Sequence, residues 1–333
     1  MALLAHRYLA ASVLTAALAL AFVGGAEADT GGPSFPSKPV TILTTFSAGS
    51  GPDTMMRAVG EVLSAKWKQP VLIDNRPGGA GFIAINAAKA AAPDGHTILM
   101  HDGDAMSALP TLFKSRNFRV FDSFEPAGAL YSTPFFVVVA ASSPWKNVGD
   151  LLAAAKAKPD AVTYGTWGVG TTAHLQSAML ETAAGVQMLH VPYKEMGQLY
   201  TAVSTGETDW ALGAMASTQS VYEGGRVKYL AIARSRRLSS LPNVPTLAEA
   251  GGPPNVEASG VVVLLTPKNT PAAINDRINR DVNAAVDSPE VQARFKTFNF
   301  EAVSWTPQEL RRQLDAKAAG YQGVVARYNI KLD

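Results

Sequence analysis

The composition of this 333-residue chain excludes several classes of protein at once. Because the chain has no cysteine, it can form neither disulfides nor thiolate metal sites, and it offers no cysteine for a lipid anchor. A net charge of +2, from 29 Lys and Arg against 27 Asp and Glu, is too small and too dispersed to indicate nucleic-acid binding. The length fits one large domain or two ordinary ones.

The first residues are typical of a secretory signal peptide. His6 and Arg7 precede an apolar run over residues 8–23, and the tripeptide at 26–28 has the A-x-A cleavage pattern. We predict export with cleavage after Ala28, which leaves a soluble protein in a periplasm. A membrane anchor is the alternative, but the run is short for about 30 Å of hydrocarbon and no charged stop-transfer cluster follows.

Beyond the leader, short apolar runs alternate with helical patterns. Runs that predict strands, several of them apolar on both faces, lie at residues 39–46, 70–74, 96–100, 134–140, 161–165, 187–193, 208–212, 227–233 and 258–265. After the first run, Met55, Val59 and Leu63 share one helical face, and Pro52 suits the first turn. Later helices are predicted to start near residues 271, 289 and 307. A chain of βα units with a helical C-terminal part predicts an α/β fold.

The sequence holds no recognised catalytic or cofactor motif. G-x-S-x-G, H-E-x-x-H and Walker A patterns are absent, and the five histidines lack metal-ligand spacing. Residues 168–173 match G-x-G-x-x-A, but the next strand ends near Glu195, too late for the acid that a dinucleotide site requires. We therefore predict no catalytic residue, no metal and no cofactor.

Two turns that join a strand to a helix predict an anion site instead. Residues 45–57 read TFSAGSGPDTMMR, and residues 166–172 read TWGVGTT. Such turns aim unpaired N–H groups and the positive end of a helix dipole at one spot, which holds an anion without Lys or Arg. Either turn alone could be an ordinary βα connection. Two of them in different halves of the chain favour a ligand cleft.

Five segments carry a resemblance to a known family. They are FPSKPVTILTTFSAGSGPDTMMR (35–57), VLIDNRPGGAGFIAINAAKAAAPDGHTILM (71–100), TYGTWGVGTTAHL (163–175), HVPYKEMGQLYTAVSTGETDWAL (190–212) and RSRRLSSLPNVPTLAEAG (234–251). In this order they resemble the Bug/TctC family, the extracytoplasmic solute-binding proteins of tripartite tricarboxylate transporters. The resemblance runs from about Phe35 to Asp333.

The resemblance implies a type II-like periplasmic-binding-protein fold, an α/β Venus flytrap with a ligand cleft between two lobes. Lobe 1 is predicted at residues 35–133 and 257–333, and lobe 2 at residues 134–256. The lobes would close around a small organic acid, and the closed form, acting as a monomer, would dock on permease subunits in the membrane. No nucleic acid takes part.

The resemblance also implies which residues bind the ligand. The first loop would hold one end of the ligand through Phe46, Ser47, Ala48, Gly49 and Ser50, with Asp53 either beside the ligand or complementing the helix N-terminus. The second loop would grip a carboxylate through Trp167, Gly168, Val169, Gly170, Thr171 and Thr172, with His174 just inside the helix. Further candidates are His101, Asp102, Tyr193, Lys194 and Asp209. Lys194 could instead form a solvated ion pair with Glu195.

The sequence departs from the family where His101-Asp102-Gly103-Asp104 replaces a pattern of small and hydroxylated residues. Two carboxylates facing a cleft would repel an anion unless they bind an amine, a hydroxyl or water. Alternatively, Asp102 caps the next turn and Asp104 is solvated. Trp167 stands where small or polar residues are commoner and is a natural stacking partner. We therefore expect an acid with an apolar or aromatic body rather than citrate.

Two other functions remain open at this point. A ligand-sensing protein would present the same closed form to a membrane sensor kinase, and its capture chemistry would be identical. An exported enzyme on the same scaffold would need a reactive group in the cleft. The nearest candidates are His101, Asp102 and Asp104, and no recognised reaction uses that trio at that spacing.

Overall fold

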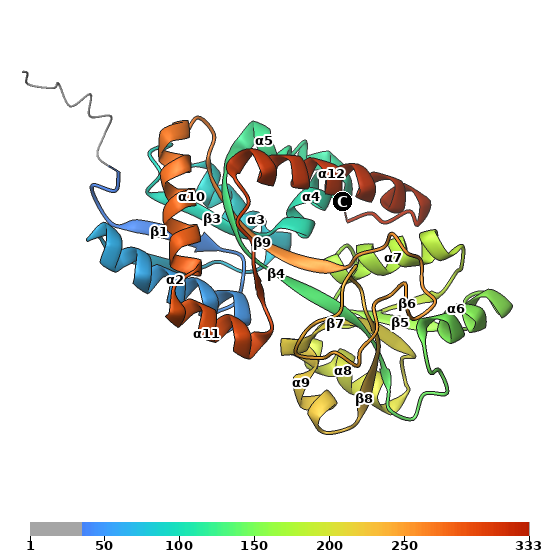
Figure 1. Cartoon of the computed structure of the whole chain (residues 1–333). Helices are drawn as coiled ribbons and strands as arrows, with labels where there is room; N and C mark the ends of the chain where they lie inside the picture. Colours follow the sequence, from blue (N-terminus) through green and yellow to red (C-terminus); the bar gives the residue numbers. More distant parts are fainter. Residues whose placement is uncertain (1–34, 333) are drawn as a thin grey trace, which may run out of the picture. The chain divides into compact units, whose positions relative to one another are not determined.

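The computed structural model describes residues 35–332, and one compact unit begins at Lys38 and holds all the elements given below (Figure 1). The predicted signal peptide at residues 1–28 lies outside the described residues. No helix of the described part is long and apolar enough to cross a membrane.

The strands of the described residues form one sheet in the order β2-β1-β3-β9-β4-β7-β5-β6, with β8 and β10 also pairing with β4. Their bounds are β1 Val40–Thr44, β2 Val71–Asn75, β3 Thr97–Asp102, β4 Phe124–Ala140, β5 Thr163–Thr166, β6 Leu189–Pro192, β7 Trp210–Ala214, β8 Val227–Ile232, β9 Ser259–Pro267 and β10 Glu301–Ala302. Every predicted strand is present. The β4 strand starts ten residues before the apolar run that predicted it. The sequence did not indicate this first part because polar residues and Pro126 interrupt the apolar pattern there.

The long strand β4 belongs to both halves of the sheet. As far as Pro134 it pairs antiparallel with β9, and from Phe135 it pairs with β7 and β8. We call β1, β2, β3, β9, β10 and the first part of β4 the first half, and the remaining strands the second half. In Figure 1 β4 and β9 run side by side through the middle of this unit.

The helices follow the strands as βα units and then as a helical C-terminal part. They are α2 Gly51–Trp67, α3 Phe82–Lys89, α4 Gly103–Leu112, α5 Val120–Ser123, α6 Val148–Ala157, α7 Thr172–Ala184, α8 Met196–Thr205, α9 Met215–Glu223, α10 Ala272–Val286, α11 Pro289–Phe298 and α12 Pro307–Arg327, with short 3₁₀ turns η1 Gly79–Gly81 and η2 Lys114–Arg116. Ser288 and Thr306 cap α11 and α12 ahead of a proline, as the sequence predicts.

Each half of the sheet has its own apolar core. In the first half, Phe82, Leu109 and Leu310 pack between the sheet and the helices α3, α4 and α12. In the second half, separate clusters around Trp210 and around Phe136 cover the two faces of β4 and its neighbours. Burial on both faces explains why these strands read as continuous apolar runs.

The topology brings four helix starts to one crevice between the two halves of the sheet. Strands β1 and β3 are parallel, as are β5 and β7, and each is followed directly by a helix: α2, α4, α7 and α9. The carboxyl ends of β1 and β3 lie at one edge of the first half, and those of β5 and β7 lie at one edge of the second half. Because β3 and β4 are both antiparallel to β9, and β7 is antiparallel to β4, β3 and β7 run in opposite directions. The first turns of these helices therefore face each other across a crevice between the halves.

Candidate ligand-binding cavity

A cavity of about 550 Å³ lies in this crevice and takes residues from both halves. Its lining is mostly apolar and aromatic: Phe46, Ser50, Gly51, Pro52, Asp102, Ala105, Tyr131, Thr133, Phe135, Trp167, Thr171, Thr172, Met196, Ala214, Ala216, Ser217, Gly260, Val262 and Phe300. Asp102 is the one charged residue in that lining, so no Lys or Arg of the described chain contributes a cation to it. The volume and the apolar walls suit a small organic ligand.

Helix N-termini supply the positive potential that the lining lacks. The first turn of α2 is capped by the Ser50 side chain and that of α4 by the Asp102 side chain. Helices α7 and α9 have no side-chain cap, because the Thr171 hydroxyl donates to the Gly168 carbonyl (2.8 Å) and Ala214 has no polar side chain. Their first N–H groups therefore stay available to an anion in the cavity.

The sheet places Asp102 and Tyr131 in one row across the floor of the cavity. On β9, Val262 pairs with Asp102 of β3 on one side and with Tyr131 of β4 on the other. Directly opposed residues point to the same face of a sheet, and all three line the cavity. His101, one position earlier on β3, therefore points to the other face.

Asp102 uses one of its two oxygens within the protein. Its Oδ1 accepts from the Ala105 N–H (2.7 Å) and from the Thr172 hydroxyl (3.0 Å). Its Oδ2 accepts no hydrogen bond from any described residue and lies beside Gly260, which has no side chain to cover it. Burial, together with the nearby charge of Asp104, raises the pKa of the Asp102 carboxyl to about 6. The interpretation that Asp102 caps a turn is thus correct, and the residue also lines the cavity.

Asp104 is fully buried, so the alternative that it is solvated is wrong. Its Oδ1 accepts from Lys317 Nζ (2.5 Å), from the Tyr321 hydroxyl (2.6 Å) and from Gln176 Nε2 (3.1 Å). The residue does not line the cavity. Asp104 lies two residues after Asp102, which caps α4. Helical geometry therefore turns the Asp104 side chain away from the cavity and into the protein interior.

Tyr131 contributes a hydroxyl group that has no hydrogen-bond partner among the described residues, although its side chain is only 1% exposed. Its ring stacks on Phe300 at 4.3 Å between centroids. Burial, with the nearby Asp102 charge, raises the pKa of Tyr131 well above its usual value, so the hydroxyl stays protonated. A buried hydroxyl without a partner beside a cavity is a natural contact for a ligand.

Trp167 lies on the second predicted loop and lines the cavity. Its indole meets the Phe135 ring edge to face, at 5.9 Å and 88°. Since that contact fixes the orientation of the indole, one ring face is already held for a ligand to pack against.

Some residues of the first predicted loop line the cavity, and others hold the loop in shape. Phe46 and Ser50 line the cavity, whereas the exposed segment 47–49 does not. Asp53 is buried and accepts from the Gly49 N–H (2.8 Å), from Asn75 (2.8 Å) and from Arg57 (3.0 Å). Burial opposes its charge, but these bonds still hold the pKa of Asp53 below its usual range. Asp53 therefore shapes the loop and does not reach the cavity.

The second predicted loop likewise has residues that line the cavity and residues that do not. Thr171 and Thr172 line the cavity, but Gly168, Val169 and Gly170 do not. His174 accepts from the Gly170 N–H (3.0 Å) and stacks on His190 with ring centroids 3.8 Å apart. Burial, and the adjoining His190, lower the pKa of His174 to about 3, so it stays neutral and able to accept this bond. Its position supports the loop from behind.

The remaining predicted contacts lie away from the cavity. His101 is buried on the opposite face, with its Nδ1 2.7 Å from the Asp102 carbonyl oxygen. The hydroxyl of Tyr193 bonds to Thr208, and Lys194 is exposed. Asp209 precedes β7 and accepts from the main chain of Thr163 at 2.8 Å, at the end of the strands opposite the cavity.

Several lining residues were not foreseen from the sequence. Tyr131, Thr133, Gly260 and Val262 come from β4 and β9, whose register no local pattern reveals. The start of α9 at residues 214–217 could have been found, because it repeats the strand-to-helix turn that singled out the other two loops.

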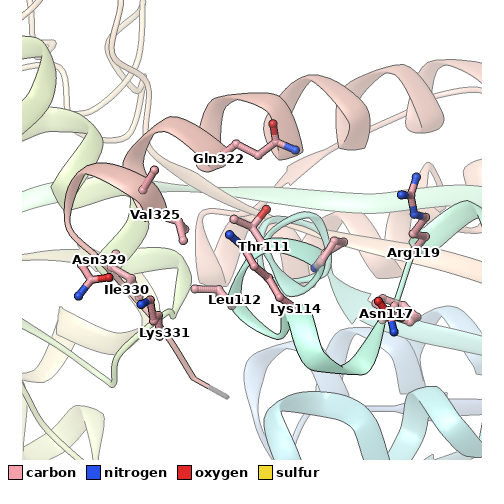
Figure 2. A pocket seen from close by; sticks show the side chains of 13 residues that line it. Thr111, Leu112, Lys114, Asn117, Arg119, Gln322, Val325, Asn329, Ile330 and Lys331 are labelled. Atoms are coloured by element: carbon pink, nitrogen blue, oxygen red, sulfur yellow. The ribbon is translucent and has the colours of Figure 1, made fainter.

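A second cavity, of about 750 Å³, lies outside the crevice between the sheet halves. Figure 2 shows side chains of α12, such as Gln322 and Val325, on one side of it, with Thr111 and Lys114 nearby. The C-terminal ends of α4 and α12 border it, and their carbonyl groups disfavour anions. Its lining mixes apolar residues with Lys114, Arg119 and Lys331, whose charges favour anions. Among the described residues no group of three or more His, Asp or Glu could hold a metal ion.

Comparison with known proteins decides the family. A model of the tripartite tricarboxylate transporter family receptor, TctC, matches residues 55–330. The chain belongs to this receptor family. A protein encoded in the TAR-I ttuE-ttuC' intergenic region of Agrobacterium vitis is 32% identical over 298 residues, covering 88% of this chain and 85% of that protein. The resemblance found in the sequence is confirmed.

Solved structures agree with that assignment. The periplasmic binding protein BugD is 25% identical with a TM-score of 0.73, covering 90% of this chain and 100% of that chain. An R. palustris protein solved with adipate is 26% identical with a TM-score of 0.76 and the same coverage. The predicted α/β, two-lobed periplasmic-binding-protein fold is thereby confirmed, whereas the lobe boundaries and the ligand contacts stay predictions.

Proposed function

We propose that this protein captures a small organic acid with an apolar body in the periplasm and delivers it to the permease of a tripartite tricarboxylate transporter. The observation that carries the proposal is the cavity itself. Apolar walls surround the starts of four helices, two of which have uncapped N–H groups. Such a site holds a carboxylate by backbone donors and excludes highly charged acids, which need many cations.

The relatives support an acid as the ligand. One solved relative holds adipate, a dicarboxylate with an apolar chain between its ends. The cavity described above offers the same combination of apolar surface and anion-binding helix starts.

Opening and closing would occur where the chain crosses between the sheet halves, once along β4 and once in the segment before β9. We place lobe 1 at residues 35–133 and 257–333 and lobe 2 at residues 134–256. The change of pairing partners on β4 between Pro134 and Phe135 supports the first boundary. A ligand that contacts both lobes stabilises the closed form, and the closed form is what a permease would recognise.

Side chains from both proposed lobes already meet beside the cavity. The Thr172 hydroxyl donates to Asp102 at 3.0 Å, and Gln176 donates to Asp104 at 3.1 Å and to the Ser259 carbonyl at 2.7 Å. These contacts join the start of α7 to α4 and β9. They would break on opening, so the ligand is enclosed only when the lobes meet.

The first test is ligand binding by residues 29–333 after unfolding and refolding to remove any carried-over ligand. Thermal shift against mono-, di- and tricarboxylates and amino acids should reveal a stabilising acid. A ligand at 100 times its Kd adds about 2.7 kcal/mol, a shift of several degrees. Lys156→Ala, which alters an exposed residue of α6 outside the cavity, should leave the shift unchanged. No shift with any acid would refute the proposal.

Transport and sensing are separated in cells. Deleting the gene should abolish uptake of the identified acid if the protein serves a permease. If uptake persists and only a transcriptional response to the acid is lost, the protein presents its closed form to a sensor kinase instead.

A further inference from the structure

The cavity holds two polar atoms that the protein leaves without partners. Asp102 Oδ2 accepts no hydrogen bond from the described residues, and the hydroxyl of Tyr131 is buried without a partner. Both belong to the row of side chains that runs across β3, β9 and β4 on the cavity floor. An unmade bond at a buried polar group is costly, so a ligand that supplies the missing partners is favoured.

The position of Asp102 relative to α7 limits what the ligand can be. The Thr172 hydroxyl touches Asp102 Oδ1 at 3.0 Å, and Thr172 is the first residue of α7. A carboxylate held by the free N–H groups of α7 would therefore lie next to Asp102. Two carboxylates so close repel each other, and no Lys or Arg in the lining offsets them.

A donor group beside the ligand's own carboxylate resolves this conflict. A hydroxyl or ammonium on the carbon next to the carboxylate would reach Asp102 Oδ2 while the carboxylate stays at α7. An ammonium would also add the missing positive charge. The side chain of such an acid would then extend among Phe46, Phe135 and Trp167.

We propose, building on the function proposed above, that the cavity selects 2-hydroxy or 2-amino acids with an aromatic or long aliphatic side chain. Asp102 Oδ2 accepts the hydrogen bond from the 2-substituent, and the Tyr131 hydroxyl donates to an oxygen of the ligand. The two unpartnered atoms of the cavity floor are thereby specificity determinants, and a second ligand carboxylate at this place is rejected.

Gly260 leaves the space through which the 2-substituent reaches Asp102. A Cβ built at Gly260 would lie 3.6 Å from Asp102 Oδ2 and 3.4 Å from the Thr133 methyl group, both ordinary van der Waals distances. An alanine therefore fits without disturbing the fold, but its methyl group covers Oδ2. Gly260→Ala tests access to the atom, and Asp102→Asn tests the atom itself.

The experiment is calorimetric titration of the full mature chain with four acids that share a benzyl group. These are 3-phenyllactate, phenylalanine, 3-phenylpropionate, which lacks the 2-substituent, and benzylmalonate, which carries a second carboxylate. The wild-type protein should bind 3-phenyllactate or phenylalanine about tenfold or more tightly than 3-phenylpropionate, because one hydrogen bond to a charged group is gained. Benzylmalonate should bind more weakly still.

The variants give the second half of the test. Asp102→Asn keeps an oxygen for the helix cap and replaces Oδ2 by an N–H₂ donor. An ammonium cannot accept from that donor, so the preference for phenylalanine should disappear. Gly260→Ala should also remove the preference, because the added methyl group covers Asp102 Oδ2. Gly320→Ala is the matched control, because it lies on α12 with open space around its position, and it should leave the preference unchanged.

The outcomes distinguish the two proposals. Equal affinity of the wild-type protein for 3-phenyllactate, phenylalanine and 3-phenylpropionate would overturn the role of Asp102 while leaving acid capture intact. A preference that survives in both variants would overturn it as well. If no acid of any class binds, acid capture and this specificity fail together.

Discussion

Lys317→Met tests how the buried charge of Asp104 is held. Asp104 is 0% exposed, and Lys317, with a side chain 25% exposed, is the partner that neutralises it. Met has a similar shape, and it removes the charge together with the hydrogen bond that Lys317 Nζ donates to Asp104. Tyr321 and Gln176 would still donate to the carboxylate, but neither carries a charge.

The expected loss follows from leaving that carboxylate buried without a cation. Breaking a buried ion pair from one side costs about 3–5 kcal/mol. Because Lys317 is partly exposed and two donors remain, we expect the lower end, about 3 kcal/mol. For a chain of this size that loss should lower Tm by about 5 °C.

Urea unfolding followed by circular dichroism, at fixed pH, measures the change. The double variant Asp104→Asn/Lys317→Met carries no buried charge and should recover a large part of the lost stability. Lys156→Met, at an exposed position on α6 without an ion pair among the described residues, should change stability by less than about 0.5 kcal/mol. A single variant as stable as that control, or a double variant no better than the single, would refute the reasoning.

Three further predictions follow from the cavity and its surroundings. Trp167→Ala should weaken binding of an aromatic acid about tenfold in calorimetry by removing a stacking surface, and unchanged affinity would exclude stacking. Because the pKa of Asp102 is about 6, the preference for phenylalanine over 3-phenylpropionate, about tenfold, should be lost as the pH falls below that value and the acceptor is protonated. Asp104, Lys317 and Tyr131 also face this carboxyl, and Asp102→Asn should show no such decline. Burial lowers the pKa of His101 in the folded protein to about 4, from 6.5 in the unfolded chain. As the pH falls, the unfolded chain therefore binds a proton at His101 before the folded protein does. This difference should remove about 3 kcal/mol from the free energy of unfolding between pH 7 and 4. Urea unfolding at several pH values checks this, and an equally steep decline in His101→Gln would contradict it.

Two of the loops that border the candidate cavity were predictable because strand-to-helix turns are local features. The spacing of small residues at 47–51 and of hydroxyl residues at 171–172 marks two helix starts, and both meet the cavity. Within each loop, however, the sequence could not separate the residues that face a ligand from those that hold the loop. Asp53 and His174 have the polarity expected of contacts, yet their hydrogen bonds run back into the protein.

The sequence by itself determined the α/β class, the strands, the helix starts and the family, because periodicity, capping and motif order act over short stretches of chain. Tertiary structure alone decided which side chains share the cavity floor. Strand β9 lies between β3 and β4 and sets Val262 beside both Asp102 and Tyr131. That register depends on packing between distant segments, and one residue of slip would turn every side chain of a strand to the other face.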